Sequence, residues 1–133
     1  MKQLTVFVEN RKGGLAEITR LLADCGVDMK ALSIADTRDF GILRLIVSDS
    51  EKASDALKKA GLLVQITEVV GVKLSDQPGA LAKALDILDK DNVNLEYLYA
   101  FLSSEAGTAR VVLRVADNIE AARILTNNGF EII

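Results

Sequence analysis

The first segment of the chain alternates apolar and more polar positions and then changes to a helical spacing. Leu4, Val6 and Val8 occupy every second position, which is the period of a half-buried β-strand. After a loop that contains glycine, apolar residues recur at the spacing of one helix face: Leu15, Ile18, Leu21 and Leu22. Gly26 follows this run, where helices commonly end on a glycine. The segment therefore predicts a strand followed by a helix.

The next forty residues predict two strands, a second helix and a last strand. Residues 27–36 and 41–48 are rich in β-forming residues, and Asp39-Phe40-Gly41 predicts the turn between them. A helix is expected over about residues 50–60, closed by Gly61, and a strand over about 62–67. The predicted order is βαββαβ, with the helices on one face of an antiparallel sheet.

The second half of the chain repeats the first. At an offset of 66 residues, Gly13-Gly14-Leu15-Ala16 falls on Gly79-Ala80-Leu81-Ala82. The same offset aligns Gly41 with Gly107 and Arg44 with Arg110. Beyond these strands the offset becomes 68, which aligns Asp49 with Asp117. A repeat of this length indicates duplicated domains rather than a solenoid. We expect an α+β fold of two βαββαβ units, residues 1–67 and 68–133.

An aromatic stripe is expected on one sheet face of the second copy. If Leu98 faces the helices, then Tyr97, Tyr99 and Phe101 point the other way. The same face of the first copy is expected to carry Phe7, Ile42 and Ile46. Such a stripe fits a face that is covered, as core between the two copies or in a homodimer, and it also fits a ligand-stacking surface. An RNA-binding sheet is disfavoured, because the aromatic residues lie on the second strand without basic flanks.

Composition narrows the function classes. The 133 residues contain no histidine and no tryptophan, so His-based triads and His-ligated metals are excluded. A net charge of −3 argues against nucleic acid as a partner. The single Cys25 cannot form a disulfide within the chain, which fits a reducing compartment. No signal peptide is apparent, and no apolar run is long enough to span a membrane. We therefore expect a cytoplasmic protein. No cofactor, metal or catalytic residue is expected, and a binding module is favoured over an enzyme.

The two glycine loops are the best candidates for a binding site. Each lies where a strand passes into a helix, and the free N–H groups of a helix start attract a carboxylate. Glycine lets a ligand approach the backbone, and Pro78 suits the first position of a helix. Asn10 and Asp76 stand three residues before the glycines and offer oxygens to an ammonium group. They are equally ordinary as caps and turn formers.

A second pair of polar residues opens the second strand of each copy. Asp28 follows Gly26-Val27, and Asn94 follows Asn92-Val93 in the second copy. Both are common turn residues, so a structural role and a ligand role stay open.

In these loops and in the segments Gly26-Val27-Asp28 and Asn92-Val93-Asn94, the chain resembles the ACT domain family of regulatory amino-acid-binding modules. The resemblance covers the whole chain as two tandem copies. It implies two ferredoxin-like βαββαβ sandwiches, each with an antiparallel sheet of order 4-1-3-2 and helices on one face. It also implies paired domains that bind a free amino acid where they meet. It assigns the ligand carboxylate to the loop backbone of Gly13, Gly14 and Leu15, and of Gly79, Ala80 and Leu81. The polar ligand contacts that it implies are Asn10 with Asn94, and Asp76 with Asp28.

The resemblance favours an allosteric amino-acid sensor or regulatory subunit, with a homodimer and a metabolic enzyme as partners. One departure from the family pattern is Lys12, which stands where proline is usual. Two other functions stay open: a small enzyme that uses Asp28, Asp76 and Glu9 as acid or base, and an assembly module with non-functional pockets.

Overall fold

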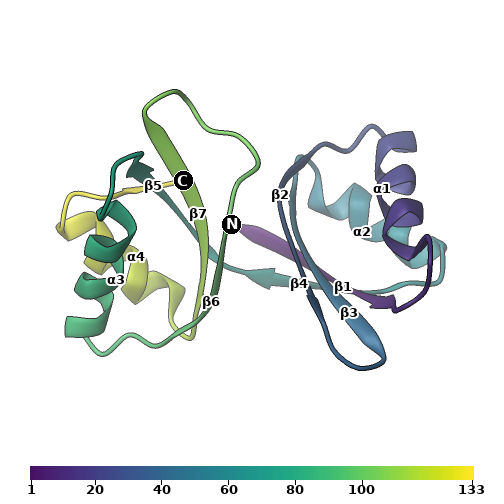
Figure 1. Ribbon diagram of the computed structural model, residues 1–133, viewed down its shortest axis with the longest axis horizontal. Helices are drawn as coiled ribbons and strands as arrows, with labels where there is room; N and C mark the ends of the chain where they lie inside the picture. The colour runs from purple at the N-terminus through teal and green to yellow at the C-terminus, as the bar shows by residue number, and fades with distance from the viewer. The chain divides into compact units, whose positions relative to one another are not determined.

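The computed structural model describes residues 1–133, which form two compact units. The first domain comprises Lys2–Thr67, and the second domain comprises Met1 together with Glu68–Ile133. Each contains its own sheet and helices (Figure 1). None of the helices is long and apolar enough to cross a bilayer.

The first domain has the predicted order of elements. They are β1 (Lys2–Glu9), α1 (Gly14–Asp24), β2 (Met29–Asp36), β3 (Phe40–Val47), α2 (Ser50–Lys59) and β4 (Leu63–Glu68). The sheet order is β2-β3-β1-β4, and both helices cover one of its faces (Figure 1). The core lies between the helices and this face, and its fully buried side chains include Leu4, Leu22, Leu45 and Leu57.

The second domain repeats this arrangement. Its elements are β5 (Val70–Ser75), α3 (Ala80–Lys90), β6 (Leu95–Ala100), β7 (Thr108–Val115), α4 (Asn118–Asn127) and β8 (Glu131–Ile132). The sheet order β6-β7-β5-β8 matches that of the first domain, and its core includes Val72, Leu88, Leu113 and Leu125. The predicted fold of two ferredoxin-like antiparallel sandwiches with sheet order 4-1-3-2 is confirmed.

Glycine closes the first helix as the sequence predicts. Gly26 has φ 68°, and its N–H donates to the carbonyl of Ala23 while that of Val27 donates to Leu22. This pair of bonds is a Schellman motif. In the second domain Asn92 takes the same place with φ 55°, the one residue other than glycine with a positive φ. Both turns deliver the chain to the start of the next strand.

The offset between the copies changes earlier than the sequence comparison predicts. Thr5 pairs with Arg44, whereas its counterpart Gly71 pairs with Val112, so Arg44 corresponds to Val112 and not to Arg110. The two extra residues therefore lie in the loop between β6 and β7, where the chain tolerates length changes. Because glycine recurs near both hairpins, comparison of the two sequences alone places the change of offset too late in the chain.

Two local predictions are wrong. The first hairpin turns over residues 37–39, where the N–H of Thr37 donates to the carbonyl of Phe40 at 2.7 Å, and Phe40 and Gly41 already belong to β3. Pro78 precedes the N-cap Gly79 instead of occupying the first helical position. In both cases the hydrogen-bonding of neighbouring residues decides the boundary.

The predicted orientation of the aromatic stripe is confirmed by the strand register. Leu98 pairs with Leu113 and both contribute to the helix-facing core. Tyr97 and Tyr99 pair with Arg114 and Val112 on the opposite face, and Phe101 continues the series through a backbone bond to Arg110. The guanidinium of Arg110 lies 4.7 Å from the centre of the Phe101 ring. That this face is covered in the assembled protein stays a prediction.

Candidate functional site

The first glycine loop leaves the start of α1 without a cap. Gly13 is the N-cap residue with φ 83° and ψ −4°, and no side chain accepts a bond from the first turn. The N–H of Gly14 donates to the carbonyl of Arg11 at 3.3 Å, which leaves the N–H groups of Leu15 and Ala16 without a protein acceptor. Two amide donors therefore face outward at the positive end of the helix.

The second loop has the same geometry. Gly79 is the N-cap residue of α3 with φ 87° and ψ −8°, again with no side-chain cap. The N–H of Ala80 donates to the carbonyl of Gln77 at 3.2 Å. The N–H groups of Leu81 and Ala82 have no protein acceptor. The duplicated loop thus repeats a pair of unsatisfied donors.

The other two helices are capped by aspartate. The Asp49 carboxylate accepts a bond from the N–H of Lys52 at 3.0 Å, and that of Asp117 accepts one from Glu120 at 2.9 Å. An Asp N-cap typically stabilises a protein by about 1 kcal/mol relative to alanine. The chain uses this stabilisation at α2 and α4 and forgoes it at α1 and α3.

The glycines are required by backbone conformation and not by close packing. A Cβ atom added to Gly13 or Gly79 would meet no atom within 4 Å. Their positive φ values are nevertheless unfavourable for side-chain-bearing residues. The space beside each glycine is open to a ligand.

Asn10 and Asp76 do not cap the helices that follow them. Their side chains are exposed and have no hydrogen-bond partner within the protein. Their backbone N–H groups donate to Asp39 and Gly107, at 3.4 and 3.0 Å, which attaches each loop to the neighbouring hairpin. The interpretation of these residues as caps is wrong, and their polar groups are available to a ligand.

A shallow cavity of about 180 Å³ lies beside the first loop. Two predicted site residues, Asn10 and Leu15, line it. Ile34 and Asp36 line it as well, and the sequence analysis did not single them out. Ile34 is 48% exposed, so β2 offers a bare apolar side chain to this cavity. Its position becomes evident only when the register places the end of β2 near the loop.

The strand-opening residues lie at the other end of each sheet. β1 ends where Glu9 pairs with Phe40 at the start of β3, whereas β2 begins where Met29 pairs with Val47 at the end of β3. At about 3.3 Å per residue, the seven steps between these pairs span roughly 23 Å. One domain alone therefore does not bring Asp28 to the loop of Asn10.

The second domain separates its two motifs in the same way. Ser75 pairs with Thr108 at the start of β7, and Leu95 pairs with Val115 at its end. Asn94 is exposed beside this far end.

In the first domain, the Asp28 carboxylate accepts a bond from the Lys30 ammonium at 2.6 Å, and both side chains are largely exposed.

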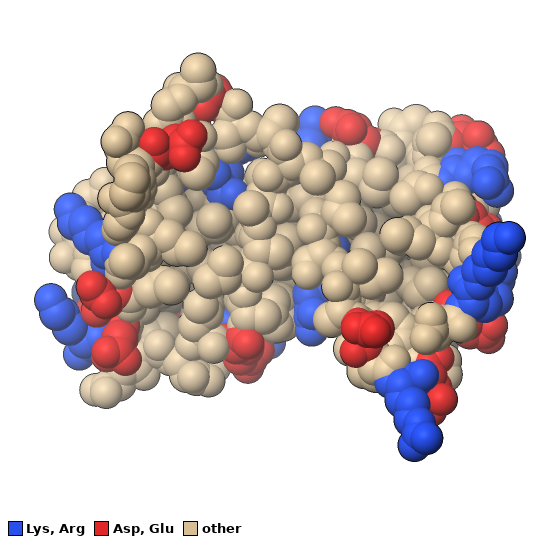
Figure 2. Space-filling model, viewed as in Figure 1, with Lys and Arg blue, Asp and Glu red and all other residues tan.

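The charged side chains seen in Figure 2 are of both signs. Figure 2 shows acidic and basic side chains interspersed on the face in view, without a continuous basic strip of the kind that nucleic-acid phosphates require. Within residues 1–133, no group of three His, Cys, Asp or Glu side chains is placed to hold a metal ion.

Comparison with known proteins gives a family and several structural relatives. A family model described as an ACT domain pair matches residues 1–132. The crystal structure of protein BT0572 from Bacteroides thetaiotaomicron is 41% identical with a TM-score of 0.92, over 99% of this chain and 90% of that one. A comparison with curated proteins found no match.

More distant structures share the fold. The regulatory subunit of aspartate kinase from Thermus thermophilus, in a ligand-free form, has a TM-score of 0.70 at 14% identity. A structure of aspartokinase alpha and beta subunits has a TM-score of 0.67 at 16% identity. Each alignment covers 95% of this chain and 90% of the other.

Proposed function

The chain belongs to the family of ACT domain pairs, and from this premise we propose that it is a regulatory protein that binds a free amino acid at its glycine loops. The observation that carries the proposal is the contrast between its helix starts. α2 and α4 are capped by aspartate, while α1 and α3 present unpaired amides behind a left-handed glycine. Uncapped donors at a helix start form a site for a carboxylate.

The first loop offers groups for both ends of an amino acid. The ligand carboxylate accepts bonds from the N–H groups of Leu15 and Ala16, because that of Gly14 is already used within the loop. The ammonium group is placed near the side-chain oxygen of Asn10. Gly13 adopts the left-handed conformation of the turn, and it leaves the space beside the helix start open to the ligand.

The second loop repeats these roles with one change of charge. Leu81 and Ala82 supply the amides, Gly79 supplies the turn, and the Asp76 carboxylate takes the ammonium group. A full negative charge replaces the neutral amide of Asn10, so the second site attracts the ligand ammonium more strongly.

Asp28 and Asn94 enter the proposal only through a second domain, because each lies across the sheet from the loop of its own domain. A double-mutant cycle tests this part of the proposal. If Asp28→Ala and Gly79→Asn act on one ligand, the double variant loses less affinity than the sum of the single variants. If Gly79→Asn is instead coupled to Asn94→Ala, the ligand is shared between second domains of two copies of the chain, because one domain holds these residues at opposite ends of β7.

The target of regulation is proposed to be a metabolic enzyme. Two structural relatives are a regulatory subunit of aspartate kinase and an assembly of aspartokinase subunits, which supports a role as a partner of a catalytic chain. Catalysis by the chain itself has less support. Glu9 and Asp28 lie at opposite ends of the first sheet, so this domain does not assemble the carboxylate pair that acid–base chemistry would use.

A thermal-shift screen of the full chain against the twenty L-amino acids tests the proposal. Anion binding at a helix start contributes about 0.3–2 kcal/mol, and each charge-assisted hydrogen bond adds about 1.5–3 before ordering costs. These terms correspond to micromolar to millimolar affinity. A ligand at about 100 times its Kd stabilises the protein by about 2.7 kcal/mol, a readily measured shift. If no amino acid raises the melting temperature at about 10 mM, the site is an assembly feature and the proposal fails.

A further inference from the structure

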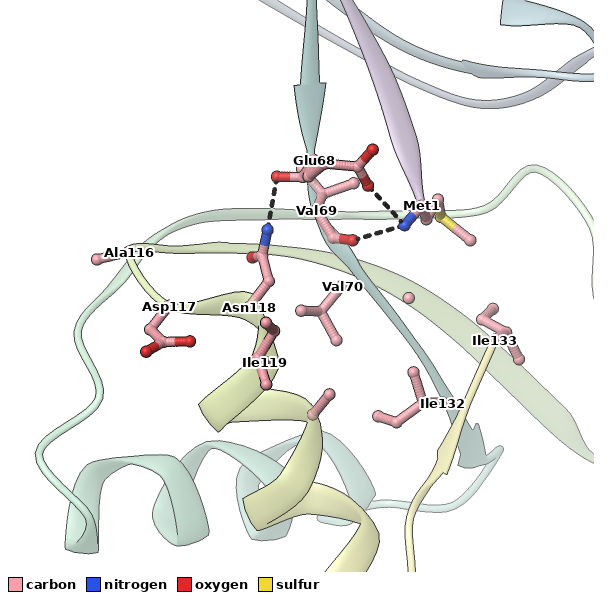
Figure 3. A pocket seen from close by; sticks show the side chains of 12 residues that line it. Met1, Glu68, Val69, Val70, Ala116, Asp117, Asn118, Ile119, Ile132 and Ile133 are labelled. Carbon is pink, nitrogen blue, oxygen red and sulfur yellow. Dashed lines mark hydrogen bonds and ion pairs between the residues drawn. The ribbon is translucent and has the colours of Figure 1, made fainter.

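Most of the carboxylates that line cavities of this chain are bound by neighbouring groups. In the second domain, a cavity of about 590 Å³ lies between β5, β8 and the start of α4, and its side chains are drawn in Figure 3. Its Glu68 carboxylate bonds the Met1 ammonium at 3.1 Å, and its Asp117 carboxylate caps α4 through the N–H of Glu120 at 2.9 Å. This cavity therefore has no free carboxylate for a cationic group.

Two other cavities have their carboxylates paired with a single basic residue. Lys73 forms ion pairs of 3.2 and 3.7 Å in a cavity of about 230 Å³. Arg11 forms ion pairs of 2.6 and 3.7 Å in a cavity of about 290 Å³. The carboxylates concerned are those of Glu105 and Glu131 for Lys73, and those of Glu17 and Glu9 for Arg11.

Asp36 differs, because it brings a free carboxylate to the cavity of about 180 Å³ beside the first glycine loop. Its side chain is exposed and accepts no bond from the protein. The hairpin does not depend on it either. The N–H of Thr37 donates to the carbonyl of Phe40 at 2.7 Å, and the Thr37 hydroxyl accepts a bond from the N–H of Phe40 at 3.2 Å. Asp36 therefore has no structural role in the turn that would explain its charge.

The two copies exchange the position of this carboxylate. At the offset of 66 that relates β2 to β6, Asp36 corresponds to Leu102, as Asn10 corresponds to Asp76. The first copy combines a neutral amide in the loop with a carboxylate on the strand, and the second copy combines a carboxylate in the loop with an apolar strand residue. The charge difference between Asn10 and Asp76 is thus offset at the second position. One carboxylate beside each loop is the pattern expected if either position serves the same ammonium group.

The remaining surface of the first cavity favours an apolar side chain. Ile34 is 48% exposed and Leu15 is 38% exposed, and both line the cavity. Ile34 contributes nothing to the core of the first domain. Arg11 also lines the cavity, but Glu9 and Glu17 neutralise it, so no free cation is left to pair with an acidic side chain.

We propose that the first loop selects an amino acid with an apolar side chain. The ligand ammonium group binds the Asp36 carboxylate together with the side-chain oxygen of Asn10, and the ligand side chain packs on Ile34 and Leu15. This inference rests on the proposed function, which supplies the contacts of the ligand carboxylate at the start of α1. It adds a charged contact for the ammonium group and a preference for the side chain.

Four probes test the ligand class on the full chain: leucine, aspartate, lysine and 4-methyl-2-oxopentanoate. The last probe keeps the carboxylate and side chain of leucine but lacks its ammonium group. Affinity at the first loop is read from the amide chemical shifts of Leu15 and Ala16. We expect leucine to bind there about tenfold more tightly than each of the other three probes.

The outcomes separate this inference from the proposed function. Equal or tighter binding of aspartate or lysine at these amides would overturn the inference and leave the proposed function standing. Equal binding of leucine and its oxo analogue would overturn the ammonium contact at Asp36. If none of the twenty L-amino acids shifts the amides of Leu15 and Ala16 or of Leu81 and Ala82, both proposals fail.

Variants with matched controls test the two contacts separately. Asp36→Asn should weaken leucine about tenfold, whereas Asp39→Asn, at an exposed aspartate of the same hairpin outside the cavity, should have no effect. Adding Asn10→Asp to Asp36→Asn places the carboxylate where the second domain has it and should restore the affinity. Equal affinity of the Asp36 and Asp39 variants, or no recovery in the double variant, would overturn the assignment of Asp36.

The side-chain contact is tested at Ile34. Ile34→Ala should weaken leucine about threefold and leave the affinity for alanine unchanged. Leu63→Ala removes an apolar side chain that is 73% exposed and lies outside this cavity, and it should affect neither ligand. An unchanged leucine affinity in Ile34→Ala, or an equal loss for leucine and alanine, would overturn the proposed side-chain preference.

Discussion

Replacing Gly79 with asparagine should abolish amino-acid binding at the second loop while leaving the fold intact. Asparagine tolerates a positive φ better than most residues, and an added Cβ at Gly79 has open space around it. In this left-handed conformation the added side chain occupies the open space beside the start of α3. It therefore obstructs the approach of the ligand carboxylate to the N–H groups of Leu81 and Ala82.

The expected magnitudes follow from the two amides. Losing two charge-assisted hydrogen bonds of at least about 1.5 kcal/mol each costs about 3 kcal/mol, roughly a hundredfold in Kd. The left-handed conformation itself costs a non-glycine residue about 1 kcal/mol of stability. Gly61 has φ 85° and equally open surroundings but follows α2 in the first domain, so Gly61→Asn is a control with the same conformational cost.

Calorimetry with the amino acid that gives the largest thermal shift measures the outcome. Both variants should melt at similar, slightly reduced temperatures, and only Gly79→Asn should lose affinity. Gly13→Asn makes the same test at the first loop. If the Gly79 and Gly61 variants bind the amino acid equally well, the amides of α3 do not hold the carboxylate and the reasoning is refuted.

Three further predictions concern the sheet face, the caps and a surface ion pair. Tyr97→Ser should lower the melting temperature or the mass measured by light scattering if its sheet face is covered, and no change in either would contradict that expectation. Asp117→Ala should cost about 1 kcal/mol in urea unfolding, whereas Asp76→Ala should cost less than about 0.5, and equal losses would count against the contrast between the loops. The hydrogen bond from Arg123 lowers the pKa of Glu120 below its usual 4.5, so its stabilisation is present above that pH and is lost as the pH falls through the lower folded-state pKa. Glu120→Gln should therefore lower the melting temperature at neutral pH and have a smaller effect in acid, below the folded-state pKa of Glu120. A difference independent of pH would refute this assignment.

The sequence predicts the fold because the apolar periodicity and the glycine caps agree with each other. Alternation at Leu4, Val6 and Val8 identifies β1, and Gly26 marks the end of α1, as the structure confirms. The sequence comparison misplaces the two-residue insertion because glycine recurs near both hairpins. The correspondence of Arg44 with Val112 becomes evident only from the strand register. Register is set by long-range pairing, which the linear comparison does not contain.

The sequence predicts which residues form the candidate site, but it does not predict which of their hydrogen-bonding groups lack a partner within the protein. The sequence identifies the loops of Asn10 and Asp76, yet it does not reveal that neither side chain caps its helix. It also does not reveal that Asp28 lies across the sheet from Asn10, since that separation arises from the length of β3.

The bonded pair of Met1 and Val69 has a consequence for the way the chain is divided. These residues flank Lys2–Thr67, and the 2.9 Å bond between them holds the two ends of the first repeat side by side. A segment with adjoining ends has the connectivity of a domain inserted into a host, which is the arrangement that tolerates excision and transplantation best. Excision of the first repeat with a short bridge across the gap should therefore preserve the edge of β5, whereas a simple cut after Thr67 would deprive Val69 of its strand partner.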